Sequence, residues 1–254
     1  AAAGVWSAFV PGAKEGRIYF HQLFAGEGRR TRARHPNSGV LKTARPLAPP
    51  PGWEKRDQAK PESFLGFYAR PGELAALKNL EDVQVIPHHA WTASRHHLAA
   101  YDPVSGLVKF TQKTLFPMGQ WEQDQRYVLE NALEFLDAPG EWFLDRKTGM
   151  VSYIPFAGED PAKTVFLAPV LPDILRLEGR PEEGKYVEYV TFEGLAFRHA
   201  DWTLGPDEFC DMQAADQLKT AAVFARGARF CTWNRCDISQ AGGYGLWLGE
   251  GCKG

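Results

Sequence analysis

The chain has 254 residues, of which 44% are hydrophobic, so it can bury the core of one large domain or of two smaller ones. A net charge of −2 gives no overall field that would attract nucleic acid or an anionic membrane, and no apolar run reaches the ~18 residues of a bilayer-spanning segment. The four cysteines are too few for a disulfide scaffold and contain no Cys-x-x-Cys pair. We therefore expect no metal, cofactor, nucleic acid or membrane insertion, and the oligomeric state stays open.

The chain starts with segments in which apolar and polar residues alternate, as they do in β-strands. Residues 5–10 predict a strand that stops at Pro11-Gly12, and residues 18–24 predict a second, paired in a hairpin with residues 29–35. Three arginines share one face of the returning strand: Arg30, Arg32 and Arg34. They could bind an acidic sugar or a carboxylate-bearing partner, or they could be solvated charges that protect an edge strand.

A proline-rich stretch and a mixed region follow. Residues 36–61 contain Ala48-Pro49-Pro50-Pro51-Gly52, which predicts an extended surface loop. Pro71 begins a predicted short helix with Leu74, Leu77 and Leu80 inward, and residues 83–86 predict a strand. The histidine-rich run 88–97 comes next, and then a hairpin joins residues 98–101 to 107–110.

The strongest helical pattern lies at residues 126–136. Its apolar side chains recur at i, i+3, i+4 and i+7, namely at Leu129, Ala132, Leu133 and Leu136, and residues 137–140 end the helix. A hairpin of residues 141–145 and 150–154 follows. Helices between strands indicate a domain inserted into, or lying over, the main β-structure.

Two copies of one pattern organise the end of the chain. Residues 191–197 align with 232–238 position by position, with apolar side chains at matching places. A strand at 221–225 fits between the copies, and 244–249 resembles another. The interval suits two coils of ~20 residues, so these segments predict a right-handed parallel β-helix. Short alternating strands also make sandwiches and barrels, which is the competing fold.

Several stretches resemble a known group of proteins. Residues 126–134 and 137–145 are similar to a signature of secreted bacterial right-handed parallel β-helix proteins, and residues 23–26, 29–36, 89–96 and 242–249 fit as well. Many of these proteins are glycoside hydrolases. The most similar are the β-xylosidase, xylanase and α-fucosidase families, in which a β-helix carries an inserted β-domain.

The resemblance implies a mainly β fold: a partial right-handed parallel β-helix with an inserted α+β or β-rich domain. Residues 1–36 would form the first β-helix strands and a hairpin, and 37–164 the inserted domain with two short helices. Residues 165–254 would form β-helix rungs, and because nothing caps them we expect an N-terminal fragment of a longer protein. The resemblance also implies a secreted or periplasmic location.

The activity implied by the resemblance is hydrolysis of a glycosidic bond in a plant or algal polysaccharide. Such enzymes use two carboxyl groups, ~5–5.5 Å apart for retention and ~6.5–9.5 Å apart for inversion. Rungs ~4.8 Å apart would bring carboxylates to such distances. The candidate catalytic carboxyls are Asp237, Asp201 and Glu250. Each could instead be a solvated or turn-stabilising acid, and the family's pair could lie beyond Gly254.

Two segments are candidates for binding the sugar. His199, Asp201 and Trp202 follow a strand directly and suit a subsite with ring stacking and hydrogen bonds, or a loop with a buried Trp. Trp91, Arg95 and His96 would reach over the groove from the inserted domain, or join the two domains. The acidic loop 203–219 could bind calcium, although its spacing matches no EF-hand loop, or it could be a solvated acidic loop.

Two rival functions remain open. A polysaccharide lyase would need a uronic-acid substrate and a Lys or Arg base, for which the Arg30, Arg32 and Arg34 face is the support. A non-catalytic carbohydrate-binding surface protein would use the aromatic side chains to hold a glycan without cleaving it.

Overall fold

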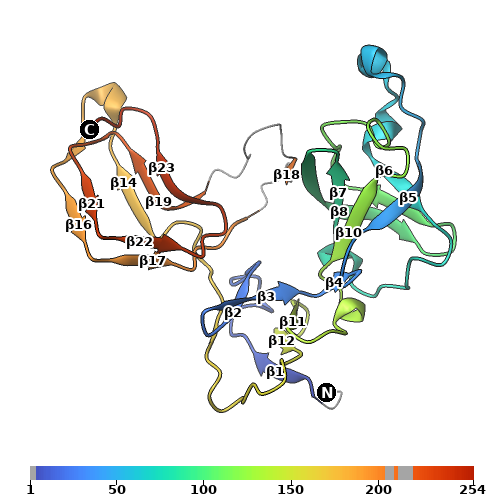
Figure 1. Ribbon diagram of the computed structural model, residues 1–254, viewed down its shortest axis with the longest axis horizontal. Helices are drawn as coiled ribbons and strands as arrows, with labels where there is room; N and C mark the ends of the chain where they lie inside the picture. The colour runs from blue at the N-terminus through green and yellow to red at the C-terminus, as the bar shows by residue number, and fades with distance from the viewer. Residues whose placement is uncertain (1–3, 204–208, 211–219) are drawn as a thin grey trace. The chain divides into compact units, whose positions relative to one another are not determined.

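A computed structural model describes residues 4–203 and 220–254, together with the backbone of 209–210. The chain forms two compact units. Unit 1 is Ala1–Lys14, Thr31–Ala162 and Leu204–Gln217, and unit 2 is Glu15–Arg30, Lys163–Thr203 and Leu218–Gly254. Strands dominate both units (Figure 1), and in the described part of the chain no helix has the length and apolar character to cross a membrane.

Unit 1 contains a closed antiparallel barrel of six strands. These strands are β5 (Leu41–Pro46), β6 (Gly66–Ala69), β7 (Gln84–His89), β8 (Thr92–Asp102), β9 (Leu107–Phe110) and β10 (Arg126–Glu130). The hydrogen-bonded order is β8-β7-β10-β5-β6-β9, and pairing of β8 with β9 closes the ring. Closure leaves the six strands without a free edge. β4 (Arg34–His35) adds to β10, and β18 (Phe209–Cys210) adds to β8.

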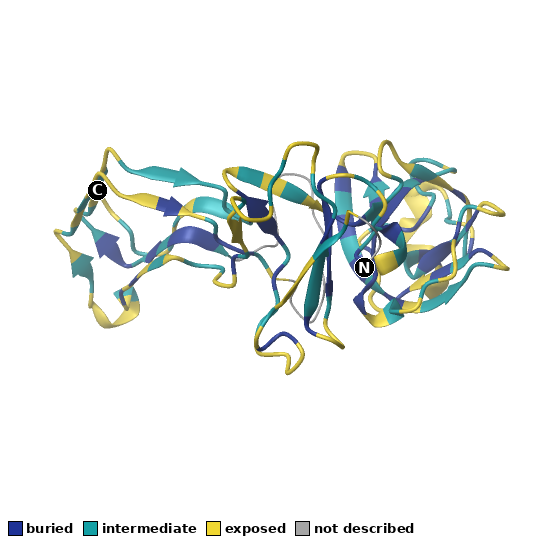
Figure 2. Ribbon diagram, turned by 90° about the horizontal axis from the view of Figure 1, so that it is seen from below, coloured by how far each residue is buried: buried dark blue, intermediate teal, exposed yellow. Residues whose placement is uncertain are grey.

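Side chains fill the barrel because they alternate along each strand. On β8, Ser94, His96 and Leu98 are buried, whereas Ala93, Arg95 and His97 between them are less so. Phe67, Phe110 and Tyr127 occupy the same core, and each is at most 1% exposed. Figure 2 shows buried positions on the strands of this unit. The barrel interior is therefore a packed core rather than a channel.

The remaining strands of unit 1 form a second sheet. β12 (Met150–Tyr153) pairs antiparallel with β1 (Trp6–Phe9) and with β11 (Glu141–Asp145), and β11 pairs with the end of β3 (Gly28–Arg32). Within unit 2, the start of β3 pairs antiparallel with β2 (Leu23–Ala25), which also pairs with β13 (Phe166–Leu167). The hydrogen-bonded order is β1-β12-β11-β3-β2-β13.

Unit 2 contains short parallel pairings. The three-stranded sheet is β14 (Leu175–Glu178), β19 (Ala221–Arg226) and β23 (Tyr244–Leu248). The two-stranded pairs are β15 (Val187–Glu188) with β20 (Ala228–Arg229), β16 (Thr191–Glu193) with β21 (Thr232–Asn234), and β17 (Ala196–Arg198) with β22 (Asp237–Ser239). The predicted alignment of the two copies is confirmed, because Phe192 pairs with Trp233 and their rings stack at 5.6 Å.

Left-handed backbone marks the corners between these short strands. Positive φ angles occur at Tyr189, Gly194 and His199 in the first copy and, at the equivalent places of the second copy, at Phe230, Arg235 and Gln240. Only Gly194 is a glycine, although this conformation costs other residues roughly 1–2 kcal/mol each. The repeat is thus one of backbone geometry as well as of side-chain pattern.

The expected right-handed parallel β-helix is wrong as the fold of this chain. Most strands belong to the closed antiparallel barrel and the six-stranded sheet, and the parallel pairings are short. The reason lies partly in the tight turns that join β7 to β8, β8 to β9 and β11 to β12, because such turns impose antiparallel pairing. The competing barrel expectation is correct for unit 1. The predicted hairpins 98–101/107–110 and 141–145/150–154 are confirmed as β8–β9 and β11–β12.

The helix predicted at 126–136 is also wrong. Residues Arg126–Glu130 form the barrel strand β10, and Asn131 then turns with φ +67°. Only Leu133–Phe135 is helical, as a single 3-10 turn. A short apolar run fits strand and helix periods equally, and pairing with β7 decides between them here. The helix predicted from Pro71 is absent as well, since only Leu80–Asp82 forms a 3-10 turn there.

The predicted domain limits overlap the observed units only in part. The expected inserted domain, 37–164, shares residues 37–162 with unit 1, while the expected first segment, 1–36, is divided between the units. The segment 15–30 joins residues beyond 162 to form unit 2. The acidic loop considered for calcium, with Asp207, Glu208, Asp211 and Asp216, lies outside the described residues.

A glycine contact offers a test of the parallel pairings. A Cβ at Gly179 would lie 2.5 Å from the carbonyl oxygen of Gly227, so both backbones would have to move. We expect Gly179→Ala to lower the stability of unit 2 by about 2 kcal/mol, measured by thermal unfolding. Gly254→Ala is the control, because nothing lies within 4 Å of its Cβ position. Equal melting temperatures for the two variants would contradict the packing described.

Candidate functional site

The candidate site of unit 2 begins at a backbone corner. β17 ends at Arg198, and His199 follows with φ +63°. This left-handed residue turns the chain, so that Ala200 and Asp201 are buried, with 0% and 2% of their surface exposed. The amide of Asp201 donates to the carbonyl oxygen of Leu171, at 2.8 Å. The corner therefore directs a carboxyl group into the interior of the unit.

The Asp201 carboxylate is held by residues from the early part of the chain. The backbone N–H of His21 donates to both carboxylate oxygens of Asp201 at 3.3 Å. Nδ1 of the His21 imidazole lies 3.2 Å from Oδ2 of Asp201. The Gln22 amide donates to Oδ1 at 3.3 Å and to the carbonyl oxygen of Ala200 at 2.9 Å. A buried carboxylate is stable only with such partners. Here they also fix the orientation of the His21 ring.

Aromatic groups surround this pair. The Trp202 ring lies over His21 with centroids 4.3 Å apart and a 31° angle between the planes, and Tyr19 meets the same imidazole edge-on at 4.8 Å. Gly242 closes the cluster, because a Cβ there would be 2.7 Å from the carbonyl carbon of Asp201 and 2.8 Å from Cδ1 of Trp202. No larger residue fits at 242 without moving them.

Two polar atoms near this pair lack a hydrogen-bond partner within the described part of unit 2. They are Oε1 of Gln22 and Nε2 of His199, and both atoms are buried. The His199 ring packs edge-on against Phe24 at 4.6 Å. Buried polar atoms normally have partners, so each of these could receive a hydroxyl group or a water molecule.

The other two predicted catalytic carboxyls, those of Asp237 and Glu250, form ion pairs with different arginines. Oδ2 of Asp237 accepts from Nε of Arg198 at 2.5 Å, and Glu27 approaches the same guanidinium at 3.4 Å. Glu250 and Glu182 share Arg226, at 3.3 Å and 2.9 Å. The pairing of β22 with β17 places Asp237 opposite Ala196, five residues before Asp201 in the sequence. The three predicted carboxyls thus have separate sets of partners among the described residues.

The predicted binding residues of unit 1 lie on the β7–β8 hairpin. Trp91 is at its two-residue turn, after Ala90 with φ +56°, and is 53% exposed. Nη1 of Arg95 donates to Gln84 at 2.8 Å and to Glu130 at 2.6 Å. His96 is 0% exposed and stacks on Phe110 at 4.9 Å. Of the three, Trp91 is therefore the one presented to solvent.

A buried chain of hydrogen bonds that sequence reasoning missed lies behind this hairpin. Gly119 N–H donates to Oε1 of Gln125, which fixes the amide so that Nε2 donates to Nδ1 of His89, at 2.7 Å. Nε2–H of His89 then donates to Oγ of Ser94 at 2.9 Å, and Nε2 of His96 is hydrogen-bonded to the same hydroxyl at 2.8 Å. The fixed Gln125 amide thus sets the direction of the hydrogen bonds from Gly119 as far as Ser94.

The arginine face predicted on residues 30–34 does not form a shared surface. Arg32 is 7% exposed, donates to Gln84 at 3.2 Å and lies over the Trp142 ring at 5.8 Å. Arg30 and Arg34 bond to the backbone carbonyls of Gly28 and Gly39. The polysaccharide lyase hypothesis depended on a shared arginine face and therefore loses its support. Because Arg32 is buried, it is also not one of the solvated charges expected to protect an edge strand.

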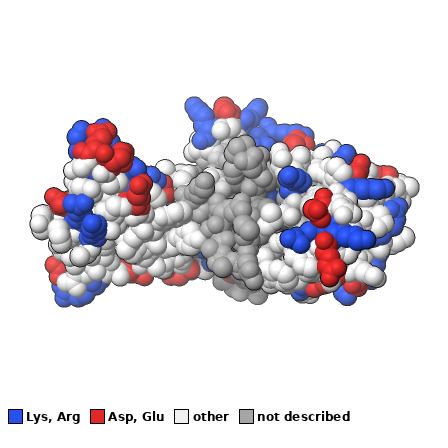
Figure 3. Space-filling model, turned by 90° about the horizontal axis from the view of Figure 1, so that it is seen from above, with Lys and Arg blue, Asp and Glu red and all other residues white. Residues whose placement is uncertain are grey.

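Charged and metal-binding groups add no further site. Acidic and basic side chains lie near one another on the visible face of each unit (Figure 3), as expected from exposed ion pairs such as Lys42–Asp124. Within the described residues no group of three or more His, Cys, Asp or Glu side chains could hold a metal ion.

The comparisons with known proteins bear on the fold. No protein-family model matches the chain, and no curated protein matches it. A solved structure named "Glycoside hydrolase" matches with a TM-score of 0.69 and 19% sequence identity, over 95% of this chain and 46% of that one. At this identity the likeness shows the fold alone, and the chain spans about half the length of that structure.

The Asp201 pair generates a stability prediction. Asp201→Asn keeps the shape but replaces one acceptor oxygen by an NH2 group that faces donors. We expect a loss of about 1–3 kcal/mol in the free energy of unfolding, measured in denaturant. Asp237→Asn is the control, since its carboxyl is 45% exposed and should change stability by less than about 1 kcal/mol. An unchanged midpoint for Asp201→Asn would show that the pair does not hold unit 2 together.

The hydrogen-bond chain generates a pH prediction. Burial, with smaller contributions from His96 and His88, lowers the pKa of His89 from 6.5 to about 3. Between these values the unfolded chain binds a proton that the folded chain does not, so stability falls as pH decreases from 6.5 toward 3, by up to about 1.4 kcal/mol per pH unit. Denaturant unfolding at pH 7, 5.5 and 4.5 measures this slope. His89→Gln should have a shallower slope, and equal slopes would contradict the assignment.

Proposed function

We propose that this chain carries the sugar-cleaving site of a glycoside hydrolase that acts on plant or algal polysaccharide, with the His21–Asp201–Trp202 cluster as a sugar subsite. The observation that carries the proposal is this cluster: a buried, fully bonded carboxylate, an oriented imidazole and an indole beside it. The likeness in fold to a solved structure named as a glycoside hydrolase supports it.

The contacts divide the roles within the subsite. Asp201 is a positioning residue, because its oxygens already accept hydrogen bonds from His21 and Gln22 and it is 2% exposed. The Trp202 indole offers an apolar face for a sugar ring. His199 Nε2 and Gln22 Oε1 could exchange hydrogen bonds with sugar hydroxyl groups, which donate and accept.

The bond-cleaving carboxyl must be reachable by substrate, which favours Asp237 and Glu250 over Asp201. Asp237 lies on β22, directly beside β17, the strand that leads to the subsite. Arg198 holds the Asp237 carboxylate in a charged hydrogen bond of 2.5 Å, which limits its rotation. We assign Asp237 the role of nucleophile or base. Glu250, 74% exposed, is the second candidate for a catalytic carboxyl.

The test uses matched carboxylates on the same arginines. Aryl-glycosides and a panel of neutral and acidic plant and algal polysaccharides serve as substrates, with reducing ends as the readout. We expect Asp237→Asn to lower kcat by at least about 100-fold, because acid–base or nucleophilic groups contribute that much. Glu27→Gln, which removes the other carboxylate of Arg198, should retain activity within about threefold.

The same comparison applies at Arg226, where Glu250→Gln is paired with Glu182→Gln. Equal losses within each pair would mean that the arginine ion pairs matter structurally and that neither carboxyl is catalytic. A wild-type protein that releases no reducing ends from any substrate would refute hydrolysis. An unsaturated product detected by ultraviolet absorbance would show elimination instead.

A further inference from the structure

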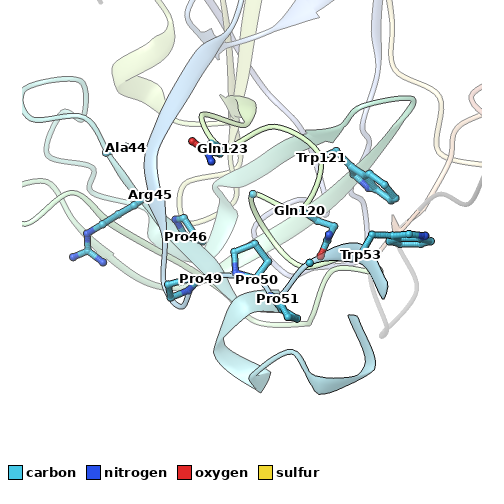
Figure 4. A pocket seen from close by; sticks show the side chains of 12 residues that line it. Ala44, Arg45, Pro46, Pro49, Pro50, Pro51, Trp53, Gln120, Trp121 and Gln123 are labelled. Atoms are coloured by element: carbon cyan, nitrogen blue, oxygen red, sulfur yellow. The ribbon is translucent and has the colours of Figure 1, made fainter. Parts of the chain in front are cut away.

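A hollow lies entirely within unit 1 and shares no residue with the cluster of Asp201. It has a volume of about 730 Å³ and is lined by the loop after β5 and by the segment before β10. Figure 4 shows Trp53, Gln120 and Trp121 at one end, Arg45 at the other, and Pro46, Pro49 and Pro50 between them. The volume falls within the range of about 300–1,000 Å³ that is usual for small-molecule sites.

Indole rings form one end of the pocket. The Trp53 and Trp121 rings lie 4.5 Å apart, and Trp53 is 43% exposed. Trp91, the exposed residue of the β7–β8 turn, meets Trp121 at 4.9 Å. Clustered exposed aromatic side chains often mark binding sites, and indole faces suit the C–H faces of sugar rings.

Polar atoms without partners lie at the same end. Oε1 of Gln120 and Nε1 of Trp121 are buried and have no hydrogen-bond partner in the described structure. One can only accept a hydrogen bond and the other can only donate one. A ligand that satisfies both must carry groups that donate and accept, as hydroxyl groups do.

The pocket wall is held rigidly before any ligand binds. Gly119 N–H donates to Oε1 of Gln125 at 2.6 Å, and Gln125 begins the buried hydrogen-bond chain to His89, Ser94 and His96. Gly119 itself has φ +79°, and a Cβ there would touch Pro46 and Pro50. The prolines of the opposite wall have fixed φ angles. A preformed wall reduces the entropy lost on binding.

The charge of the lining favours a neutral ligand. No Asp or Glu is among the described residues that line the pocket, and the cation there, Arg45, lies 3.7 Å above the ring of Tyr68. A basic ligand would need a carboxylate, which the described lining does not offer. A second guanidinium beside the pocket, that of Arg56, lies 4.2 Å over the Trp53 ring, so both cations are in contact with aromatic faces.

We propose that this pocket binds a neutral oligosaccharide, packed against its indole and proline side chains and with hydroxyl groups bonded to Gln120 and Trp121. This is a binding subsite in unit 1, and it requires no chemistry at Asp201 or Asp237. It does not depend on hydrolysis, so it stands or falls separately from the proposed activity.

The test is titration of the whole chain with neutral β-linked hexasaccharides of glucose, xylose and mannose, by calorimetry and tryptophan fluorescence. We expect one of them to bind, with a Kd raised about tenfold or more by Trp53→Ala and by Gln120→Ala. Phe230→Ala is the matched control, because Phe230 is 51% exposed and belongs to unit 2. It should leave the Kd unchanged.

Three results would overturn the proposal. One is no binding of any neutral hexasaccharide at millimolar concentration. Another is binding that Trp53→Ala and Gln120→Ala leave intact. The third is tighter binding of hexagalacturonate, an acidic sugar, or of a proline-rich peptide. Circular dichroism of both variants checks that they are folded, and Trp53→Phe, which keeps an aromatic face, should recover part of the affinity.

Discussion

The contact on which unit 2 depends is the one between the Asp201 carboxylate and the His21–Gln22 backbone and side chains. It ties a short early segment to strands formed near the end of the chain. Because the carboxylate is buried, its hydrogen bonds are required and their geometry is restricted. The ring of His21, the indole of Trp202 and the close approach of Gly242 all follow from that restriction. The hydrogen bonds that the buried Asp201 carboxylate requires therefore also fix the orientation of the side chains around it.

Both units meet the same difficulty, which is to join short strands without leaving backbone groups unpaired. Unit 1 solves it by closing six strands into a barrel, which removes free edges among them. Unit 2 pairs the short strands of one copy with those of the other, and left-handed corners recur at the same places in both copies. In each unit a polar residue lies next to the end of a strand: His199 directly after β17, and Gln125 directly before β10. The candidate sites in the two units lie beside these strand ends.

Local pattern was enough to predict the hairpins and the alignment of Phe192 with Trp233, because turns and two-residue periodicity are properties of adjacent residues. It failed at β10, where an apolar run fits helix and strand alike and the partner strand β7, much earlier in the chain, decides. It also failed for the fold class, since two copies of a repeat say nothing about how the other strands pair. Asp201, His199 and Trp202 were identified as neighbours in sequence. His21 and Gln22 could not be, because no short-range signal connects them with a residue 180 positions away.

That separation has a consequence for how the chain is made. Residues 15–30 leave the ribosome long before their partners beyond 162, so they must wait while all of 31–162 is synthesised. At translation speeds of about 5–20 residues per second, His21 waits roughly 10–35 s for Asp201. Through that interval Phe20, Leu23 and Phe24, all buried in the finished protein, have nothing of unit 2 to cover them. The barrel can close in the meantime, because all six of its strands lie between Leu41 and Glu130.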